Sequence, residues 1–198
     1  MLIVGLTGGI ASGKSFVVKY LEKLKIPAHD SDRAINLLYE KPSNVFLKYL
    51  KKNNFGRAIS VGKIVKSIIK EDIFTNSEKR KKLEFFLHKY VSQERKKFLK
   101  ENKNKKIIFL DIPLLFEKKL QKECDFICST TASLKTREKR ALQRPGMSRR
   151  LFDLIVKAQA KDIERRAKSH FIINTQDSRS KTYLQVDNMI YCILNKKK

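Results

Sequence analysis

The stretch that decides the fold is a loop near the start of the chain, Gly8-Gly9-Ile10-Ala11-Ser12-Gly13-Lys14-Ser15. It fits G-x-x-x-x-G-K-[ST], the pattern of a phosphate-binding loop (P-loop). Its glycines let backbone N–H groups converge on phosphate oxygens, and a following helix offers its positive end to the same anion. We expect Lys14 to reach the β- and γ-phosphates of a nucleoside triphosphate and Ser15 to ligate Mg²⁺.

The residues on either side of the loop supply the structural context that it requires. Leu2–Leu6 is a short apolar run typical of a buried strand. From Lys14 to Leu24, apolar residues recur at helical spacing. The order strand, loop, helix favours a true phosphate-binding loop over a glycine-rich turn that is followed by Lys-Ser by chance.

Further strand signals alternate with helical segments. Apolar runs lie at 107–110, 126–128 and 171–173, and 27–30 is also expected to form a short strand, which ends in Asp30. Apolar residues keep helical spacing from 42 to 105, where no strand signal interrupts them. Ser180–Leu194 is expected to form a final helix, followed by a frayed tail, Asn195–Lys198. Such alternation predicts an α/β fold with a parallel sheet.

Length and composition indicate a folded protein with a large basic excess. The 198 residues suit one domain, or one domain that carries insertions. Forty-five Lys and Arg against 20 Asp and Glu give a formal charge of +25, which would attract any polyanion. The excess is mostly scattered Lys without interleaved aromatics for base stacking. Compositional bias explains it as well as function does, and we expect no specific nucleic-acid partner.

The lengths of the apolar runs and the pattern of cysteines indicate the cellular compartment. No run approaches the roughly 18–20 residues that cross a bilayer, and the apolar N-terminus lacks a basic leader. Cys124, Cys128 and Cys192 form no CxxC pair, and we interpret them as core thiols in a reducing compartment. A cytoplasmic protein without membrane contact is expected.

Carboxylates follow two of the predicted strands. Asp111 can hold Mg²⁺ directly or through water, although many strands end in Asp for turn or capping reasons. Glu117 fits a metal site and a solvated helix position equally well. Asp30 and Asp32 can accept the proton of a nucleophile or simply cap a helix. Beside a phosphate-binding loop, we favour the metal site for Asp111 and a catalytic use for the pair.

The segment 131–169 is predicted to form a helical hairpin rich in guanidinium groups. Its arginines surround a break at Pro145-Gly146 and include Arg137, Arg140, Arg144, Arg149 and Arg150. Arg140 and Arg144 lie one helical turn apart and can converge on one anion. We expect these two to bind ATP or the transition state, whereas Arg149 and Arg150 fit a solvated basic face.

Taken together, three segments resemble the dephospho-CoA kinase family in order and spacing. They are Leu6–Ser15, Asp30-Ser31-Asp32 and Asp111-Ile112-Pro113-Leu114-Leu115-Phe116-Glu117. The first segment alone would indicate only a P-loop protein, whereas the other two are specific to this family. The resemblance runs from Leu2 to about Asn174 and includes Arg140-Ala141-Leu142-Gln143-Arg144, Gln159 and the strand Phe171–Asn174.

The resemblance implies a fold, a reaction and a division of the chain. The fold would be a P-loop kinase core with a five-stranded parallel sheet. The reaction moves the γ-phosphoryl of ATP to the ribose 3′-hydroxyl of dephospho-CoA, the last step of coenzyme A synthesis. The implied parts are a core (1–31, 106–134 and 160–198), a helical CoA-binding region (32–105) and a lid (135–159). We expect a monomer.

The resemblance also implies roles for individual residues. Asp32 would be the general base, and Lys14 and Arg140 would also be catalytic. Asp30, Leu114 and Leu115 would join Asp32 in binding the substrate, and Ser15 and Asp111 would hold Mg²⁺. The nucleotide-binding set would be Gly8, Gly9, Ala11, Ser12, Gly13, Lys14, Ser15, Phe16, Arg140 and Arg144.

Three residues depart from the family pattern. Ala11 replaces a usual glycine, which is tolerated if φ there is negative. Ser31 replaces a usual alanine, and Gln176 stands where a glycine commonly follows the last strand. Two other functions stay open: a P-loop kinase for a nucleoside, nucleotide or sugar, and a basic ATPase that binds nucleic acid.

Overall fold

The computed structural model describes residues 1–195, which form two compact units. Unit 1 comprises Met1–His29 and the chain from Asn102 onward, and it contains the phosphate-binding loop. Unit 2 comprises Asp30–Glu101. The predicted lid range, 135–159, therefore belongs to the same compact unit as the loop.

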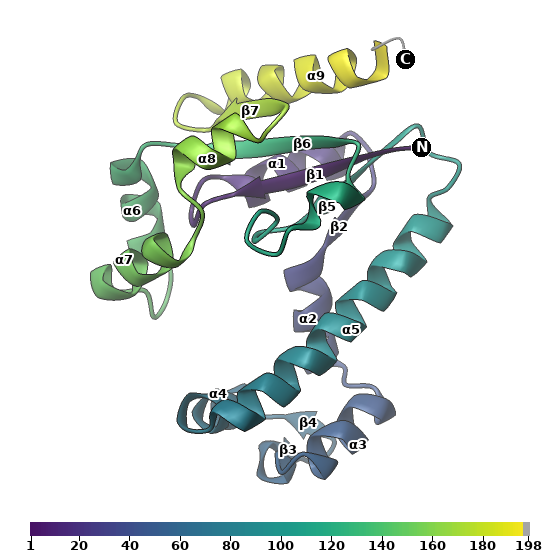
Figure 1. The fold of residues 1–198 in the computed structure, drawn as a ribbon, viewed down its shortest axis with the longest axis vertical. Coiled ribbons are helices and arrows are strands. Elements are labelled where there is room, and N and C mark those ends of the chain that lie inside the picture. The colour runs from purple at the N-terminus through teal and green to yellow at the C-terminus, as the bar shows by residue number, and fades with distance from the viewer. Residues whose placement is uncertain (196–198) are drawn as a thin grey trace. The chain divides into compact units, whose positions relative to one another are not determined.

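Unit 1 is built on a five-stranded sheet in the order β2-β5-β1-β6-β7. The strands are β1 (Leu2–Gly8), β2 (Ala28–Asp30), β5 (Ile107–Asp111), β6 (Phe126–Thr131) and β7 (Phe171–Asn174). The pairs β1–β5, β1–β6 and β6–β7 are parallel (Figure 1). The predicted α/β fold with a five-stranded parallel sheet is confirmed.

Helices cover both faces of this sheet. In Figure 1, α1 (Lys14–Lys23) lies behind the sheet and α8 (Asp162–Ala167) in front of it. The apolar face of α9 (Arg179–Asn195) joins that of α1 in one hydrophobic cluster with β1. This confirms the predicted last helix, whereas Lys196–Lys198 of the predicted frayed tail lie outside the described residues. The remaining elements are α6 (Leu134–Leu142), α7 (Arg149–Ala158) and the short η2 (Leu120–Glu123).

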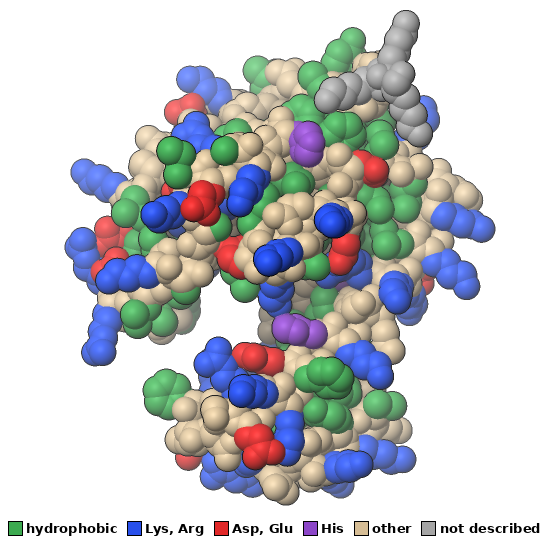
Figure 2. Space-filling view, viewed as in Figure 1, with side chains coloured by type: hydrophobic (Ala, Val, Ile, Leu, Met, Phe, Trp, Pro, Cys, Tyr) green, Lys and Arg blue, Asp and Glu red, His purple; other side chains and the backbone are tan. Residues whose placement is uncertain are grey.

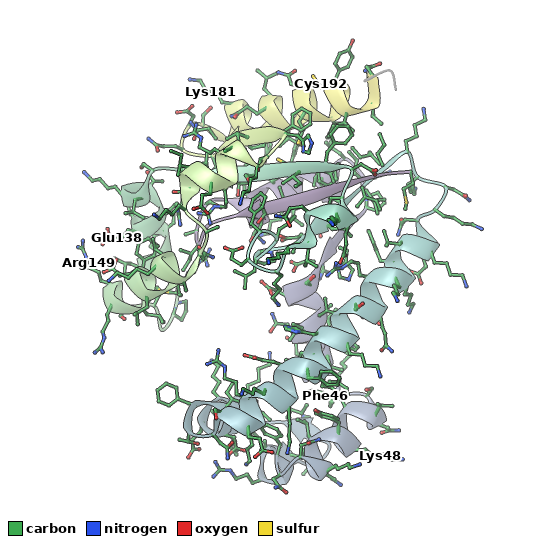
Figure 3. The ribbon with its side chains drawn as sticks, in the orientation of Figure 1. Phe46, Lys48, Glu138, Arg149, Lys181 and Cys192 are labelled. Atoms are coloured by element: carbon green, nitrogen blue, oxygen red, sulfur yellow. The ribbon has the colours of Figure 1, made fainter. Side chains whose placement is uncertain are left out.

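Unit 2 has a hydrophobic core of its own. Its elements are α2 (Ser31–Glu40), α3 (Asn44–Lys52), η1 (Gly56–Ala58), β3 (Ile59–Ser60), β4 (Lys63–Ile64), α4 (Lys66–Thr75) and α5 (Ser77–Glu101). Phe46, Leu50 and Phe55 are completely buried at its centre, and Figure 3 labels Phe46 there. Phe46 stacks on Phe86 of α5, with ring centroids 5.0 Å apart.

The prediction of uninterrupted helix from 42 to 105 is wrong at one place. Ile59 pairs with Ile64 and Ser60 with Lys63 in a small antiparallel hairpin, so that Ile64 lies on a strand and the next helix begins only at Lys66. Val61 and Gly62 have φ values of 46° and 72°, as a type I′ turn requires at both central residues. The sequence did not indicate this turn, because a β-branched residue such as Val61 is rare at positive φ.

A buried carboxylate joins three elements of unit 2. Asp72 of α4 is 4% exposed and bonds Arg57 of η1 at 2.5 Å and Lys79 of α5 at 3.3 Å. Burial by itself would raise the pKa of Asp72, but the hydrogen bonds and charges of Arg57 and Lys79 outweigh it and lower that pKa. The ionised form is therefore the one that holds these elements together.

The interpretation of all three cysteines as core thiols is correct only for Cys128. This thiol is buried, and burial raises its pKa to about 12. Cys124 is half-buried, whereas Cys192 is exposed on α9 (Figure 3). Among residues 1–195, no helix is long and apolar enough to cross a membrane.

Candidate active site

The phosphate-binding loop joins the central strand β1 to α1, as the sequence predicts. Gly13 is the N-cap of α1 with φ 91°, so the free N–H groups of the first helical turn lie at the end of the loop. At Gly8 a side chain has no room, because the hydroxyls of Ser12 and Thr130 occupy the place of a Cβ. These two hydroxyls are hydrogen-bonded at 2.7 Å, which ties the loop to β6.

Ala11 does not meet the condition under which its departure from glycine was expected to be tolerated. Its φ is 56°, in the left-handed region that costs a residue with a Cβ roughly 1–2 kcal/mol. Its methyl group is buried in a small cluster with Ala141 and Phe152 of the helical hairpin. The hairpin therefore packs on the loop at the residue whose backbone is strained.

Lys14 and Asp111 form an ion pair. Lys14 begins α1, and Asp111 ends β5 beside Leu6 of β1 with only 3% of its surface exposed. Ser15, the next residue of α1, is exposed. The Asp111 carboxylate and the Ser15 hydroxyl are hard oxygen donors, the kind of ligand that Mg²⁺ prefers.

Arg140 is connected to the loop through a single threonine. The guanidinium of Arg140 donates to the hydroxyl and the carbonyl oxygen of Thr175, at 2.9 and 2.6 Å. The Thr175 hydroxyl in turn donates to the carbonyl oxygen of Ser12 at 2.8 Å. Arg144 is exposed in the turn that follows α6, two residues beyond the end of that helix, and its predicted convergence with Arg140 on one anion stays a prediction.

The segment that follows β5 has two different uses. Leu115 is completely buried, and its Cδ1 occupies the place of a Cβ on Gly5. Its side chain belongs to the core and is not available to a substrate, whereas that of Leu114 is 36% exposed. Glu117 accepts a hydrogen bond from the N–H of Ala160 at 2.7 Å, which gives this carboxylate a structural contact between α7 and α8.

Two further predicted residues have identifiable structural contacts. The ring of Phe16 stacks on Tyr183 of α9 with centroids 5.2 Å apart, so the Phe16 side chain packs away from the loop onto a helix. Gln176 accepts a hydrogen bond at 2.9 Å from the N–H of Ser133, the N-cap of α6. The family's usual glycine could not make this connection.

The Asp30-Ser31-Asp32 segment opens unit 2. Asp30 is the N-cap of α2 and accepts a hydrogen bond from the N–H of Arg33 at 2.9 Å, so its capping role is confirmed. Ser31 is the first residue of that helix. Asp32 lies in the first turn of α2 with an exposed side chain.

Sequence reasoning assigned no role to two buried arginines that lie beside the loop. Arg137 is 2% exposed, donates to the carbonyl oxygen of Ile10 at 2.9 Å and pairs with Asp162 at 2.7 Å. Arg165 pairs with the same carboxylate. In the sequence Arg137 is one of several hairpin arginines, and nothing local distinguishes a buried guanidinium from a solvated one.

Comparison with known proteins agrees with this geometry. A family model described as dephospho-CoA kinase matches residues 2–181. The dephospho-CoA kinase of Bartonella quintana is 34% identical over 98% of this chain and 99% of its own, and that of Fusobacterium nucleatum is 35% identical over 94% and 96%. The crystal structure of TT1252 from Thermus thermophilus covers 98% of both chains at 26% identity, with a TM-score of 0.79. The chain therefore belongs to the dephospho-CoA kinase family and shares its P-loop kinase fold and its ATP-dependent phosphotransferase function.

Proposed function

We propose that this chain transfers the γ-phosphoryl of ATP to the ribose 3′-hydroxyl of dephospho-CoA. The observation that carries the proposal is the Lys14–Asp111 pair at the N-terminus of α1. It joins the cation of a phosphate-binding loop to the carboxylate at the tip of the adjacent strand. These are the two parts that hold the phosphates and the metal in P-loop kinases.

The nucleotide side of the reaction uses charge and fixed geometry. Lys14 and the positive end of α1 would neutralise the β- and γ-phosphates. Ser15 and Asp111 would hold Mg²⁺, which when bound supplies further positive charge between the phosphates. Because Asp111 is paired with Lys14, Lys14 would exchange this partner for a phosphate as the nucleotide binds.

The acceptor side would use the first turn of α2. An attacking hydroxyl must lose its proton as the new P–O bond forms, and a carboxylate can accept it. Asp32 is the proposed base because its side chain is exposed and available. Asp30 would act by fixing the start of α2 through its bond to Arg33.

The remaining parts of the proposal concern partners. The helical region 32–105 is the proposed binding region for the CoA moiety, and 135–159 the proposed lid. Lys and Arg side chains are spread over the visible face among acidic and apolar ones (Figure 2), which supports a compositional origin of the charge. We therefore propose that the protein has no specific nucleic-acid partner. As expected from the sequence, we also propose a cytoplasmic monomer.

An acceptor panel tests the proposed reaction. With ATP and Mg²⁺, the protein should phosphorylate dephospho-CoA and leave nucleosides, nucleotides and sugars unchanged, as measured by ADP release and product mass. Phosphorylation of another acceptor in the panel, but not of dephospho-CoA, would overturn the substrate assignment. ATP hydrolysis that depends on added DNA or RNA would instead favour the nucleic-acid alternative.

Replacement of Arg140 by alanine should lower kcat/KM for ATP about 10²-fold, because a charge-assisted contact to a phosphate is lost in a partly buried site. Arg144→Ala should have a smaller effect in the same direction, since Arg144 is exposed and has no comparable anchor. Steady-state kinetics with ATP as the varied substrate measure both. Unchanged ATP kinetics in both variants would mean that neither guanidinium contacts the nucleotide.

A further inference from the structure

Both backbone polar groups of Ile10 are held by side chains of the helical hairpin. The N–H of Ile10 donates to Oε1 of Gln159 at 2.8 Å, and its carbonyl oxygen accepts a hydrogen bond from Nε of Arg137 at 2.9 Å. Arg137 lies in α6, and Gln159 is the C-cap of α7. The two arms of the hairpin therefore hold one residue of the phosphate-binding loop from both sides.

The arginine of this pair is itself held rigidly. Its guanidinium is almost fully buried and pairs with Asp162, which also pairs with Arg165. Burial lowers the pKa of Arg137, an effect that the charge of Asp162 opposes. Both guanidinium groups lie where a side chain on Gly9 would be. Arg137 therefore has little freedom to leave the loop backbone.

Holding the Ile10 carbonyl also fixes the next amide. In a trans peptide the C=O and the N–H point in opposite directions, so the bond from Arg137 turns the N–H of Ala11 the other way. Ala11 has φ 56°, a conformation that a residue with a Cβ rarely adopts unless its surroundings impose it. The hydrogen bond from Arg137 therefore fixes the peptide directly before Ala11, the one non-glycine residue with positive φ among the described loop residues 8–15.

We propose that Arg137 and Gln159 are positioning residues that keep the Ile10–Ala11 peptide in its phosphate-binding orientation and offset the strain of alanine in the left-handed region. They act through the loop backbone and need no contact with ATP. The proposal rests on the nucleotide site proposed above but not on the identity of the acceptor. Loss of the constraint should therefore matter more with Ala11 than with glycine at that position.

A double-mutant cycle between Arg137→Gln and Ala11→Gly tests this coupling. Binding of ATP with Mg²⁺ is measured by calorimetry without any acceptor, so the result does not depend on the substrate assignment. In the wild-type background, Arg137→Gln should weaken ATP binding about 10-fold, which corresponds to about 1.4 kcal/mol. In the Ala11→Gly background, the same change should weaken binding by less than about 3-fold, since glycine adopts the required φ without strain.

Two further variants make the outcome decisive. Gln159→Met removes only the acceptor for the Ile10 N–H. It should also weaken ATP binding more with Ala11 than with glycine at that position. This variant replaces Arg137→Gln in the cycle if Arg137→Gln fails to fold. Arg149→Gln removes an exposed arginine that pairs with Glu138 at 3.2 Å (Figure 3) and should leave ATP binding unchanged. Equal losses in both backgrounds would overturn the proposal, because they would indicate a direct charge effect on the phosphates.

Discussion

Lys14→Ala is expected to lower kcat about 10²–10³-fold, the usual cost of removing one charge-stabilising group from a water-excluded site. The lysine begins α1 beside the loop glycines, where its ammonium can follow the negative charge that develops on the γ-phosphoryl. Measurement of single-turnover rates at saturating ATP isolates this step from binding. A near-normal rate would mean that the loop is not the catalytic site.

The same substitution has a structural consequence that needs its own control. It removes the Lys14 partner from Asp111, a carboxylate that is 3% exposed, and a buried charge that loses its partner is costly. The double variant Lys14→Ala/Asp111→Asn avoids that charge. Asp111→Asn also removes a proposed Mg²⁺ ligand, so the double variant is a control for stability alone. If thermal unfolding shows that Lys14→Ala stays folded under the assay conditions while its rate falls, the rate loss belongs to the chemistry.

Asp32→Asn is expected to reduce kcat about 10²–10⁴-fold, the range attributed to a positioned general base. Asparagine keeps the shape of the side chain but cannot accept a proton at neutral pH, so KM for ATP and for dephospho-CoA should change little. Steady-state kinetics with each substrate varied in turn separate these effects.

A matched control lies on the same helix. Glu40 is exposed at the last position of α2, and Glu40→Gln removes the same charge far from the first turn. It should leave kcat unchanged. Full activity of Asp32→Asn would remove the proposed role from that carboxylate while leaving the family assignment as it stands.

Four strands of the main sheet, β1, β5, β6 and β7, could be predicted because each contains a short apolar run with a distinct end. The β3–β4 hairpin could not be predicted, because its turn has Val61 at the position where a type I′ turn usually has asparagine or aspartate. Periodicity alone therefore assigned Ile64 to a helix. Local sequence predicts best where the residue type and the required backbone conformation agree.

In the candidate active site, too, some residues could be predicted from the sequence and others could not. Lys14 and Asp111 could be singled out because one belongs to the loop motif and the other ends a buried strand, although the sequence does not predict their ion pair. The burial of Arg137, the side-chain position of Leu115 and the positive φ of Ala11 depend on tertiary packing. No pattern near these residues in the sequence distinguishes them from solvated or unstrained ones.

The bonds that hold the phosphate-binding loop come from residues far along the chain. Thr130, Arg137, Gln159 and Thr175 bond loop residues that lie 118, 127, 149 and 163 positions earlier. Contacts of such sequence separation form late in folding because a long loop must close first. Because synthesis runs from the N-terminus towards the C-terminus, the loop must wait until these later segments have been made, and a product truncated before Thr130 would lack all four bonds.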